Sequence, residues 1–363
     1  MATPKETIWT LDPHTAAKHE ILRRYLGAWF RILGTYHGRI VYIDGFAGPG
    51  RYANGEPGSP LIALDVAPKQ PNGNASEIVF WFIEERSDRH AHLEQELAKL
   101  SLPAHFRVIA NSGRFHEKCG SVLESITTAG QQLAPTFAFI DPFGFSGIPF
   151  TLIERLLRQE RCEAFITFMV DAINRFLDHP EDTVVRHIAE AFGGDDAIAV
   201  AKGSGDRVAK LRELYQGKLA TVAKYVRYFE MRDRNNRPQY YLFFASNNAL
   251  GHLKMKEAMW KVDPDGDFRF SDATNPNQLV LFEADPTSDL AAQIRSRFSE
   301  QGEVTAKQVR TYVEDRTAYL KKHMTAALTR EEKEGRLLVE ELKVDGRRRR
   351  AGTFPDNARL RWV

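Results

Sequence analysis

Tyr42-Ile43-Asp44-Gly45-Phe46-Ala47-Gly48-Pro49-Gly50 is the stretch that decides the fold. A short apolar run ends here in a carboxylate, and glycines follow at once, which is typical of a strand that turns sharply at the edge of a sheet. In an open α/β sheet such a turn lies at the carboxyl ends of the parallel strands, where ligands bind. The spacing differs from Gly-x-Gly-x-x-Gly and no Gly-Lys-Ser/Thr follows, so it supports neither a dinucleotide-binding nor a P-loop site.

Further apolar runs of strand length follow this turn, with helical patterns between them. The runs are apolar on both faces and cover Ile78–Ile83, Phe106–Ala110, Thr136–Ile140 and Ala164–Val170. Such alternation predicts a doubly wound, largely parallel sheet. Two later runs, Tyr225–Met231 and Tyr240–Ala245, are joined by a short turn-rich link, so we expect an antiparallel hairpin at the sheet edge and seven strands in all.

The length of 363 residues favours two domains. We expect the α/β domain to cover residues 1–284, with a helical insertion at about 177–225. Residues 285–363 read as a small α+β unit: helices, and then two strands flanking the loop that holds Arg347, Arg348, Arg349 and Arg350. This order predicts a winged helix-turn-helix.

Charge and cysteine content narrow the function classes. The 50 Lys and Arg nearly balance the 48 Asp and Glu, but residues 285–363 hold 17 basic and 13 acidic residues. A local basic surplus of this kind attracts polyanions. Two cysteines exclude a disulfide framework, and no local motif has the spacing of a metal site, so we expect no metal and a cytoplasmic location. No apolar run reaches the roughly 20 residues of a membrane helix.

The glycine turn resembles the first motif of class I S-adenosylmethionine-dependent methyltransferases. The resemblance implies that Asp44, Gly45, Phe46, Gly48 and Gly50 bind that cofactor. In such a sheet an acidic residue ending the second strand accepts hydrogen bonds from ribose hydroxyls, which makes Glu84 the next candidate. Asn111 ends the third strand and is a candidate contact for the adenine.

Asp141-Pro142-Phe143-Gly144 follows the fourth strand, where the transferred methyl group should lie. Methyltransferases that act on exocyclic base amines carry an Asp/Asn–Pro–Pro–aromatic loop at this point, and the loop binds a flipped base. Asp141 and Pro142 match that loop, whereas Phe143 and Gly144 differ from it. We therefore expect Asp141, Pro142 and Phe143 to form the catalytic loop.

Several motifs together resemble the three-Cys-motif partner protein family, TcmP. The resemblance rests on Lys18-His19-Glu-Ile-Leu-x-x-Tyr25-Leu26, the glycine turn, Gly58-Ser59-Pro60-Leu61, Phe139–Gly144 and the stretch from Ser246-Asn-Asn-Ala-Leu-Gly-His252 to Trp260. It implies a three-Cys-motif protein as partner. A weaker resemblance to RlmJ-type ribosomal-RNA adenine methyltransferases covers Lys-His and the Ala47–Tyr52 turn, and implies that Lys18 and His19 contact the cofactor.

The sequence thus predicts an S-adenosylmethionine-dependent methyltransferase acting on DNA or RNA, first of all on an exocyclic amine, with Arg347–Arg350 gripping phosphates. One alternative is a catalytically degenerate, cofactor-binding scaffold that works with the three-Cys-motif partner, which the altered Asp-Pro-Phe-Gly loop motivates. A second is a metal-dependent nuclease that uses Asp44, Glu84 and Asp141.

Overall fold

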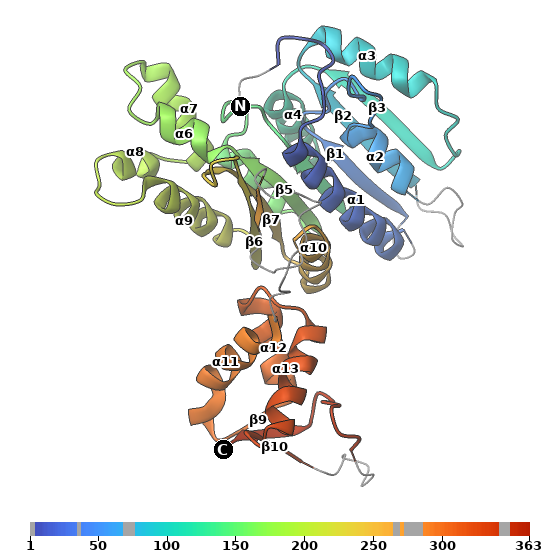
Figure 1. The fold of residues 1–363 in the computed structure, drawn as a ribbon. Coiled ribbons are helices and arrows are strands. Elements are labelled where there is room, and N and C mark those ends of the chain that lie inside the picture. Colours follow the sequence, from blue (N-terminus) through green and yellow to red (C-terminus); the bar gives the residue numbers. More distant parts are fainter. Residues whose placement is uncertain (1–3, 35–37, 68–76, 264–268, 272–285, 341–348) are drawn as a thin grey trace. The chain divides into compact units, whose positions relative to one another are not determined.

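A computed structural model describes residues 4–34, 38–67, 77–263, 269–271, 286–340 and 349–363. The chain divides into two compact units: Met1–Val262 with Arg269–Asn275, and Asp263–Phe268 with Pro276–Val363. Figure 1 shows the first unit as a sheet between helical layers, and the second as a small helical unit with its own short strands. None of the helices in the described ranges is both long and apolar enough to cross a bilayer.

The first unit is built on an eight-stranded sheet with the order β3-β2-β1-β4-β5-β7-β6-β8. All neighbouring strands pair in parallel except β7, which runs antiparallel to both β5 and β6. The strands are β1 (Arg39–Asp44), β2 (Glu77–Glu84), β3 (Phe106–Ser112), β4 (Thr136–Ile140), β5 (Cys162–Phe168), β6 (Tyr225–Arg232), β7 (Pro238–Ser246) and β8 (Arg269–Ser271).

Helices cover both faces of this sheet, as expected for strands that are buried on both sides. On one face α1 and α10 pack against each other and α2 packs on β1, whereas α4, α5 and α9 belong to the other layer. The helices of this unit are α1 (Pro13–Leu33), α2 (Ser59–Val66), α3 (Ser87–Ala98), α4 (Phe115–Thr128), α5 (Phe150–Leu157), α6 (Val170–Phe176), α7 (Asp182–Phe192), α8 (Asp196–Ala201), α9 (Arg207–Ala220) and α10 (Ala249–Val262).

The α/β prediction is confirmed, and the helices α7 to α9 fill the stretch expected to be a helical insertion. Two predictions were wrong. The described sheet has eight strands rather than seven, because β8 pairs with β6 and takes the edge that the hairpin was expected to form. The fifth strand ends at Phe168, since Val170 already begins α6. An apolar run alone does not reveal where a buried strand becomes a buried helix.

The second unit combines helices with an antiparallel sheet in the order β10-β11-β9. The predicted capping box is present, since Thr305 and Gln308 bind each other's backbone at the start of α12. The strand β9 was not predicted; at three residues it is too short to show a pattern. The elements are α11 (Pro286–Phe298), a short 3₁₀ turn (Ser299–Gln301), β9 (Glu303–Thr305), α12 (Ala306–Arg316), α13 (Lys321–Lys333), β10 (Leu337–Val339) and β11 (Arg359–Trp362).

The arginine loop is described only in part, because Arg347 and Arg348 lie outside the described residues. The guanidinium of Arg349 donates to the carboxylate of Glu332 and to the carbonyls of Glu340 and Thr353. Its side chain is largely buried, whereas Arg350 is exposed. Arg349 therefore ties α13 to the loop that precedes β11.

Candidate active site at the carboxyl edge of the sheet

The glycine turn links β1 to the segment before α2 and needs its glycines. Gly48 and Gly50 have φ angles of +64° and +84°, which side-chain-bearing residues rarely adopt. A Cβ on Gly50 would also lie 2.9 Å from Leu93 of α3. The carbonyl of Gly50 accepts from the Gly58 N–H at 2.8 Å, so the turn closes directly onto the start of α2.

Glu84, at the end of β2, lies against this turn. Its Oε2 accepts from the Gly48 N–H at 2.8 Å and its Oε1 from the Arg86 N–H at 2.9 Å. Burial raises the pKa of Glu84, although both backbone hydrogen bonds oppose the rise. The carboxylate predicted for the ribose thus also holds the glycine turn in place.

Asp44 is fully buried at the end of β1. Burial raises its pKa to about 7, against hydrogen bonds from the side chains of Ser59 and Tyr42 and from the Phe46 N–H, and the nearby charge of Asp141 adds to the rise. A carboxyl group with this pKa changes its ionisation near neutral pH, and a cationic ligand beside it would favour the ionised form and lower the pKa again.

Asp141 is held from two sides just after β4. Its Oδ2 accepts from Lys18 Nζ of α1 at 2.5 Å, and its Oδ1 from the Thr167 hydroxyl of β5 at 2.6 Å. Each oxygen keeps a further lone pair, because a carboxylate has about four acceptor positions. Lys18 is therefore brought to the predicted catalytic aspartate rather than standing at the glycine turn.

His19 and Tyr52 pack against each other beside Asp141, with 5.8 Å between their ring centroids. Burial, with the neighbouring charge of Lys18, lowers the pKa of His19 to about 3, so its imidazole is neutral at physiological pH. Burial and the charge of Asp141 raise the pKa of Tyr52 above its ordinary range. Both rings are thus uncharged walls of the site.

Aromatic rings form a further wall of the site. The Trp9 ring packs edge-on against Tyr52 at 5.6 Å and against Phe143 at 5.5 Å, measured between ring centroids. The guanidinium of Arg89 lies over the Trp9 ring at 4.5 Å and donates to the carbonyls of Pro4 and Glu6. Contacts with Arg89 and Phe143 therefore hold the segment that precedes α1 against the Asp141 loop.

Two small cavities adjoin at this point, and Asp141 and Phe143 line both. One, of about 30 Å³, is bounded by the glycine turn and His19. The other, of about 90 Å³, is bounded by Pro142 and by residues that sequence reasoning did not select, among them Thr167, Met169 and Tyr240. The predicted catalytic loop thus lies where the cavity at the glycine turn meets the second cavity, together with Trp9 and Tyr52, which also line both.

Other predicted residues are placed less directly. The Oδ1 atom of Asn111 accepts from the Trp81 indole N–H at 2.7 Å, and Asn111 lines neither cavity. Gly45 packs tightly on Phe115, where a Cβ would lie 2.7 Å from that ring, and the Phe46 ring contacts the same phenylalanine. Gly45 and Phe46 therefore also serve the packing of α4 below the turn.

Sequence reasoning missed Trp9, Tyr52 and Thr167 as site residues. Thr167 had a signal, since it is the single hydroxyl in the apolar run Ala164–Val170. Tyr52 stood inside the turn on which one resemblance rested. Trp9 had no signal, because its segment follows no periodic pattern.

The described ranges offer no set of side chains suited to bind a metal ion. They contain no cluster of three or more His, Cys, Asp or Glu side chains with suitable spacing. Asp44, Glu84 and Asp141 are instead bound to separate groups: Ser59, the Gly48 N–H and Lys18. The nuclease alternative therefore has no support in this geometry.

No family model matches the chain, and no curated protein matches it in sequence. Among solved structures, it is similar to protein LPL1258 from Legionella pneumophila, with a TM-score of 0.40 and 11% identity over 68% of this chain and 93% of that one. It is also similar to the O-methyltransferase from Bacillus cereus in complex with SAH, with a TM-score of 0.35 and 13% identity over 65% and 82% of the two chains.

A third similar structure is the plantazolicin methyltransferase BpumL in complex with SAH, with a TM-score of 0.31 and 10% identity over 64% of this chain and 86% of that one. Likenesses at these TM-scores carry no functional argument, so the function rests on the geometry of the site. The resemblances to TcmP and to the RlmJ type stay predictions.

Proposed function

We propose that the chain is an S-adenosylmethionine-dependent methyltransferase that acts on nucleic acid. The observation that carries the proposal is the position of Asp141, which lines both the cavity at the glycine turn and the cavity beyond it. A transferase needs such a group between its donor and its acceptor. The sheet order, with the reversed β7 between β5 and β6, matches that of class I methyltransferases.

The residues at the turn fit the cofactor. A Cβ on Gly48 would make ordinary contact with Trp9 at 3.8 Å, so the positive φ and not crowding requires glycine here, and the Gly48 backbone lines the cavity directly. Asp44 and Glu84 are buried behind the turn and line neither cavity, so their carboxylates would act on the cofactor's ammonium and sulfonium charges and ribose hydroxyls from behind the turn. Asn111 keeps its amide N–H groups for the adenine edge, because Trp81 occupies only its Oδ1.

The chain's own residues align the reaction. When bound, S-adenosylmethionine would supply a methyl group for direct transfer to a nucleophile, with the neutral thioether S-adenosylhomocysteine as the leaving group. Lys18 and Thr167 fix the orientation of Asp141, whose remaining lone pairs can accept the hydrogens of an exocyclic amine. Phe143, which lines the second cavity, offers a ring surface for a flipped base. Holding the reacting groups in this alignment lowers the activation barrier of methyl transfer.

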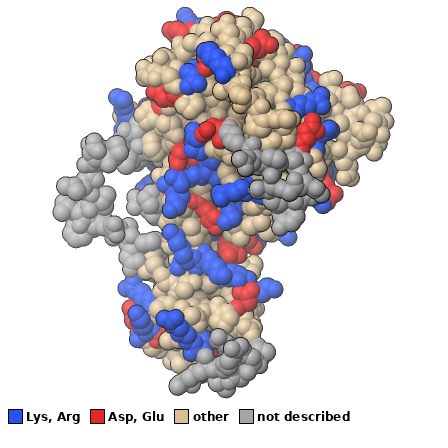
Figure 2. Space-filling model, turned by 90° about the vertical axis from the view of Figure 1, so that its right-hand side faces the viewer, with Lys and Arg blue, Asp and Glu red and all other residues tan. Residues whose placement is uncertain are grey.

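The C-terminal unit supports a nucleic-acid substrate. Its helix and strand order, with the sheet β10-β11-β9, fits a winged helix in which α13 is the recognition helix. Lys321 and Lys322 stand exposed at the start of α13, and Figure 2 shows Lys and Arg side chains over the visible face of this unit. We therefore place phosphate contacts on Lys321 and Lys322 as well as on the arginine loop, with Arg349 as its anchor.

A degenerate scaffold remains the second candidate, in which a three-Cys-motif partner protein completes the assembly. The observation that favours it is the Lys18–Asp141 ion pair, since it occupies one side of the carboxylate that an acceptor amine would need. The altered third and fourth positions of the Asp-Pro-Phe-Gly loop point the same way.

The deciding experiment is transfer of a labelled methyl group to separate pools of rRNA, tRNA and DNA. We expect wild type to label one pool, and Asp141→Ala and Asp141→Asn to lose at least 100-fold in rate while they still bind the cofactor in calorimetry. Cofactor binding by wild type without label in any pool, with and without the partner, would favour the scaffold. Unchanged labelling by both variants would refute the role of Asp141.

A further inference from the structure

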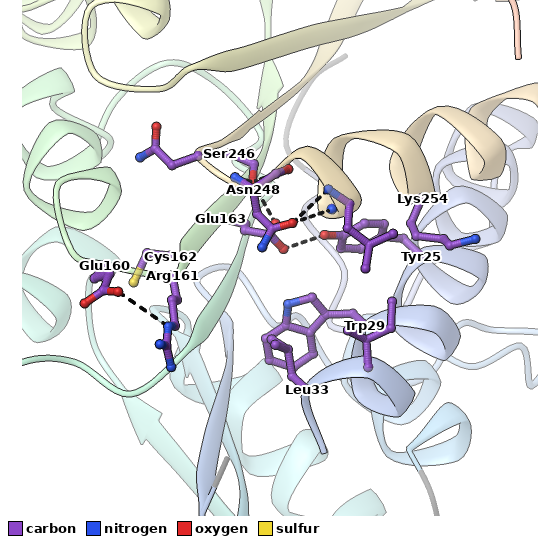
Figure 3. A pocket seen from close by; sticks show the side chains of 14 residues that line it. Tyr25, Trp29, Leu33, Glu160, Arg161, Cys162, Glu163, Ser246, Asn248 and Lys254 are labelled. Carbon is purple, nitrogen blue, oxygen red and sulfur yellow. Dashed lines mark hydrogen bonds and ion pairs between the residues drawn. The ribbon is translucent and has the colours of Figure 1, made fainter. Parts of the chain in front are cut away.

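A cavity of about 350 Å³ lies at the opposite edge of the sheet, where β5 begins and β7 ends. In Figure 3, Trp29 and Leu33 project from α1 on one side of it, and Arg161 and Cys162 lie across from them. Its remaining wall is the start of α10 with the Ser246–Gly251 stretch. The proposed methyl-transfer site uses none of these residues.

Glu163 is the carboxylate in the depth of this cavity. It is 95% buried, and it accepts hydrogen bonds from the Tyr25 hydroxyl and, at 2.7 Å, from the Ser246 hydroxyl. Both donors are neutral groups. Burial raises the pKa of Glu163, and the neutral side chains of Tyr25, Ser246 and Trp29 oppose that rise. A cation beside the carboxylate would offset the cost of its desolvation.

The rest of the lining is largely apolar, and its two basic side chains are paired. Trp29, Ile32, Leu33 and Leu250 provide aromatic and aliphatic surface. At the mouth, the side chain of Arg161 lies 3.6 Å from Glu160, and that of Lys254 lies 2.8 Å from Glu257. These cations are therefore engaged with carboxylates of their own.

The wall from α10 is shaped around Glu163. Asn248 caps the helix by accepting from the N–H groups of Leu250 and Gly251. A Cβ on Gly251 would collide with Glu163 Oε1, so a glycine is needed for the helix to approach the carboxylate. The motif Ser246–His252, which the methyl-transfer site leaves unused, thus forms this cavity together with Tyr25 of the Lys18–Leu26 motif.

We propose that this cavity is a second binding site, for a small molecule with an apolar, preferably aromatic, body and one primary ammonium group. The apolar body lies against Trp29 and Leu250, and the ammonium group donates to Glu163. The volume falls in the range of about 300–1,000 Å³ of small-molecule pockets, and a mostly apolar lining with one buried polar group is their usual composition. A deep single carboxylate selects a small ligand over a protein surface.

The test is calorimetric titration of the full chain with tryptamine, 2-phenylethylamine and benzylamine, each against its neutral counterpart, 3-ethylindole, ethylbenzene and toluene. We expect at least one amine to bind at 1:1 stoichiometry and at least 10-fold more tightly than its counterpart. Glu163→Gln should remove that preference, because it keeps the shape but loses the charge.

A plugging variant separates this site from others. Leu250 is 45% exposed at the mouth, so Leu250→Trp should fill the entrance without disturbing the core and should abolish binding. Leu100→Trp is the matched control, since Leu100 is exposed to 37% and does not line the cavity. The proposal is overturned if no amine binds saturably, if amines and neutral counterparts bind alike, or if Leu250→Trp and Leu100→Trp behave the same.

Discussion

Lys18 Nζ lies 2.5 Å from Asp141 Oδ2, so helix α1 is joined to the loop that follows β4 by an ion pair. Two turns further along α1, Tyr25 binds Glu163 at the other edge of the sheet. Glu163 and Thr167 both belong to β5, and Thr167 holds Asp141 from the other side. The helix α1 thus contacts both carboxylates, Asp141 and Glu163, and the strand β5 carries one of them and binds the other.

Loss of the Lys18 ammonium should impair transfer more than cofactor binding. In Lys18→Met, Asp141 keeps Thr167 but loses its charged partner. A hydrogen bond to a charged group contributes about 1.5–3 kcal/mol, so we expect single-turnover methyl transfer to fall roughly 10- to 150-fold. Calorimetry should show the cofactor dissociation constant within about threefold of wild type. Thr167→Val is the companion variant; a large loss of cofactor affinity in Lys18→Met alone would instead place Lys18 at the cofactor.

Gly50 and Gly55 offer a matched pair of substitutions in one turn. Both have positive φ, +84° and +93°, but a Cβ on Gly50 meets Leu93 at 2.9 Å, whereas nothing lies within 4 Å of a Cβ on Gly55. Gly55→Ala should cost about 1–2 kcal/mol of backbone strain, and Gly50→Ala more than that. Urea unfolding compares the two. Equal losses would show that strain, and not the packing of the turn on α3, sets the requirement at Gly50.

The buried carboxyl of Asp44 predicts a pH-dependent stability difference. Its pKa is raised from 3.8 to about 7, so between these pH values the folded state binds more protons than the unfolded state. The stabilisation that protonated Asp44 gives to the folded state is therefore complete below pH 3.8 and is lost as the pH rises to about 7. Asp44→Asn cannot ionise, so its stability relative to wild type should increase from pH 4 to pH 7.5, by up to about 4 kcal/mol. Urea unfolding at intervals of half a pH unit measures this. A difference that does not change with pH would mean that Asp44 has an ordinary pKa.

The salt dependence of nucleic-acid binding should show whether the C-terminal unit contacts phosphates. If Lys321 and Lys322 contact phosphates, the double alanine variant should bind the labelled nucleic acid more weakly, and the slope of log K against log salt should fall by roughly 1–2. Filter binding from 50 to 300 mM salt gives this slope. Lys307→Ala, at an exposed lysine of α12, is the control. Arg349→Ala should destabilise the unit as well, because it removes the charged partner of Glu332 and leaves that carboxylate with the Gly352 N–H. An unchanged slope in the double variant would remove α13 from the interface.

The order of strands and helices in the first unit was predictable because buried strands and amphipathic helices carry strong periodic signals. β8 and β9 were not, since three residues hold no period and such strands form only where a neighbouring strand offers free backbone groups. The arginine loop is a further example. Four consecutive arginines suggest a phosphate-binding loop, yet in the fold one of them, Arg349, forms an ion pair with Glu332.

By itself, then, the sequence determined which chemistry stands at the strand ends: the glycine turn after Asp44, Glu84 after the second strand and the Asp141 loop after the fourth. Parallel strands bring their carboxyl ends to one edge, so these groups had to gather there. Only the tertiary structure decided the partners: Lys18 and Thr167 on Asp141, Trp9 above the loop, and Tyr25 and Ser246 on Glu163. Such contacts join residues far apart in the chain through side-chain packing, and no local pattern records them.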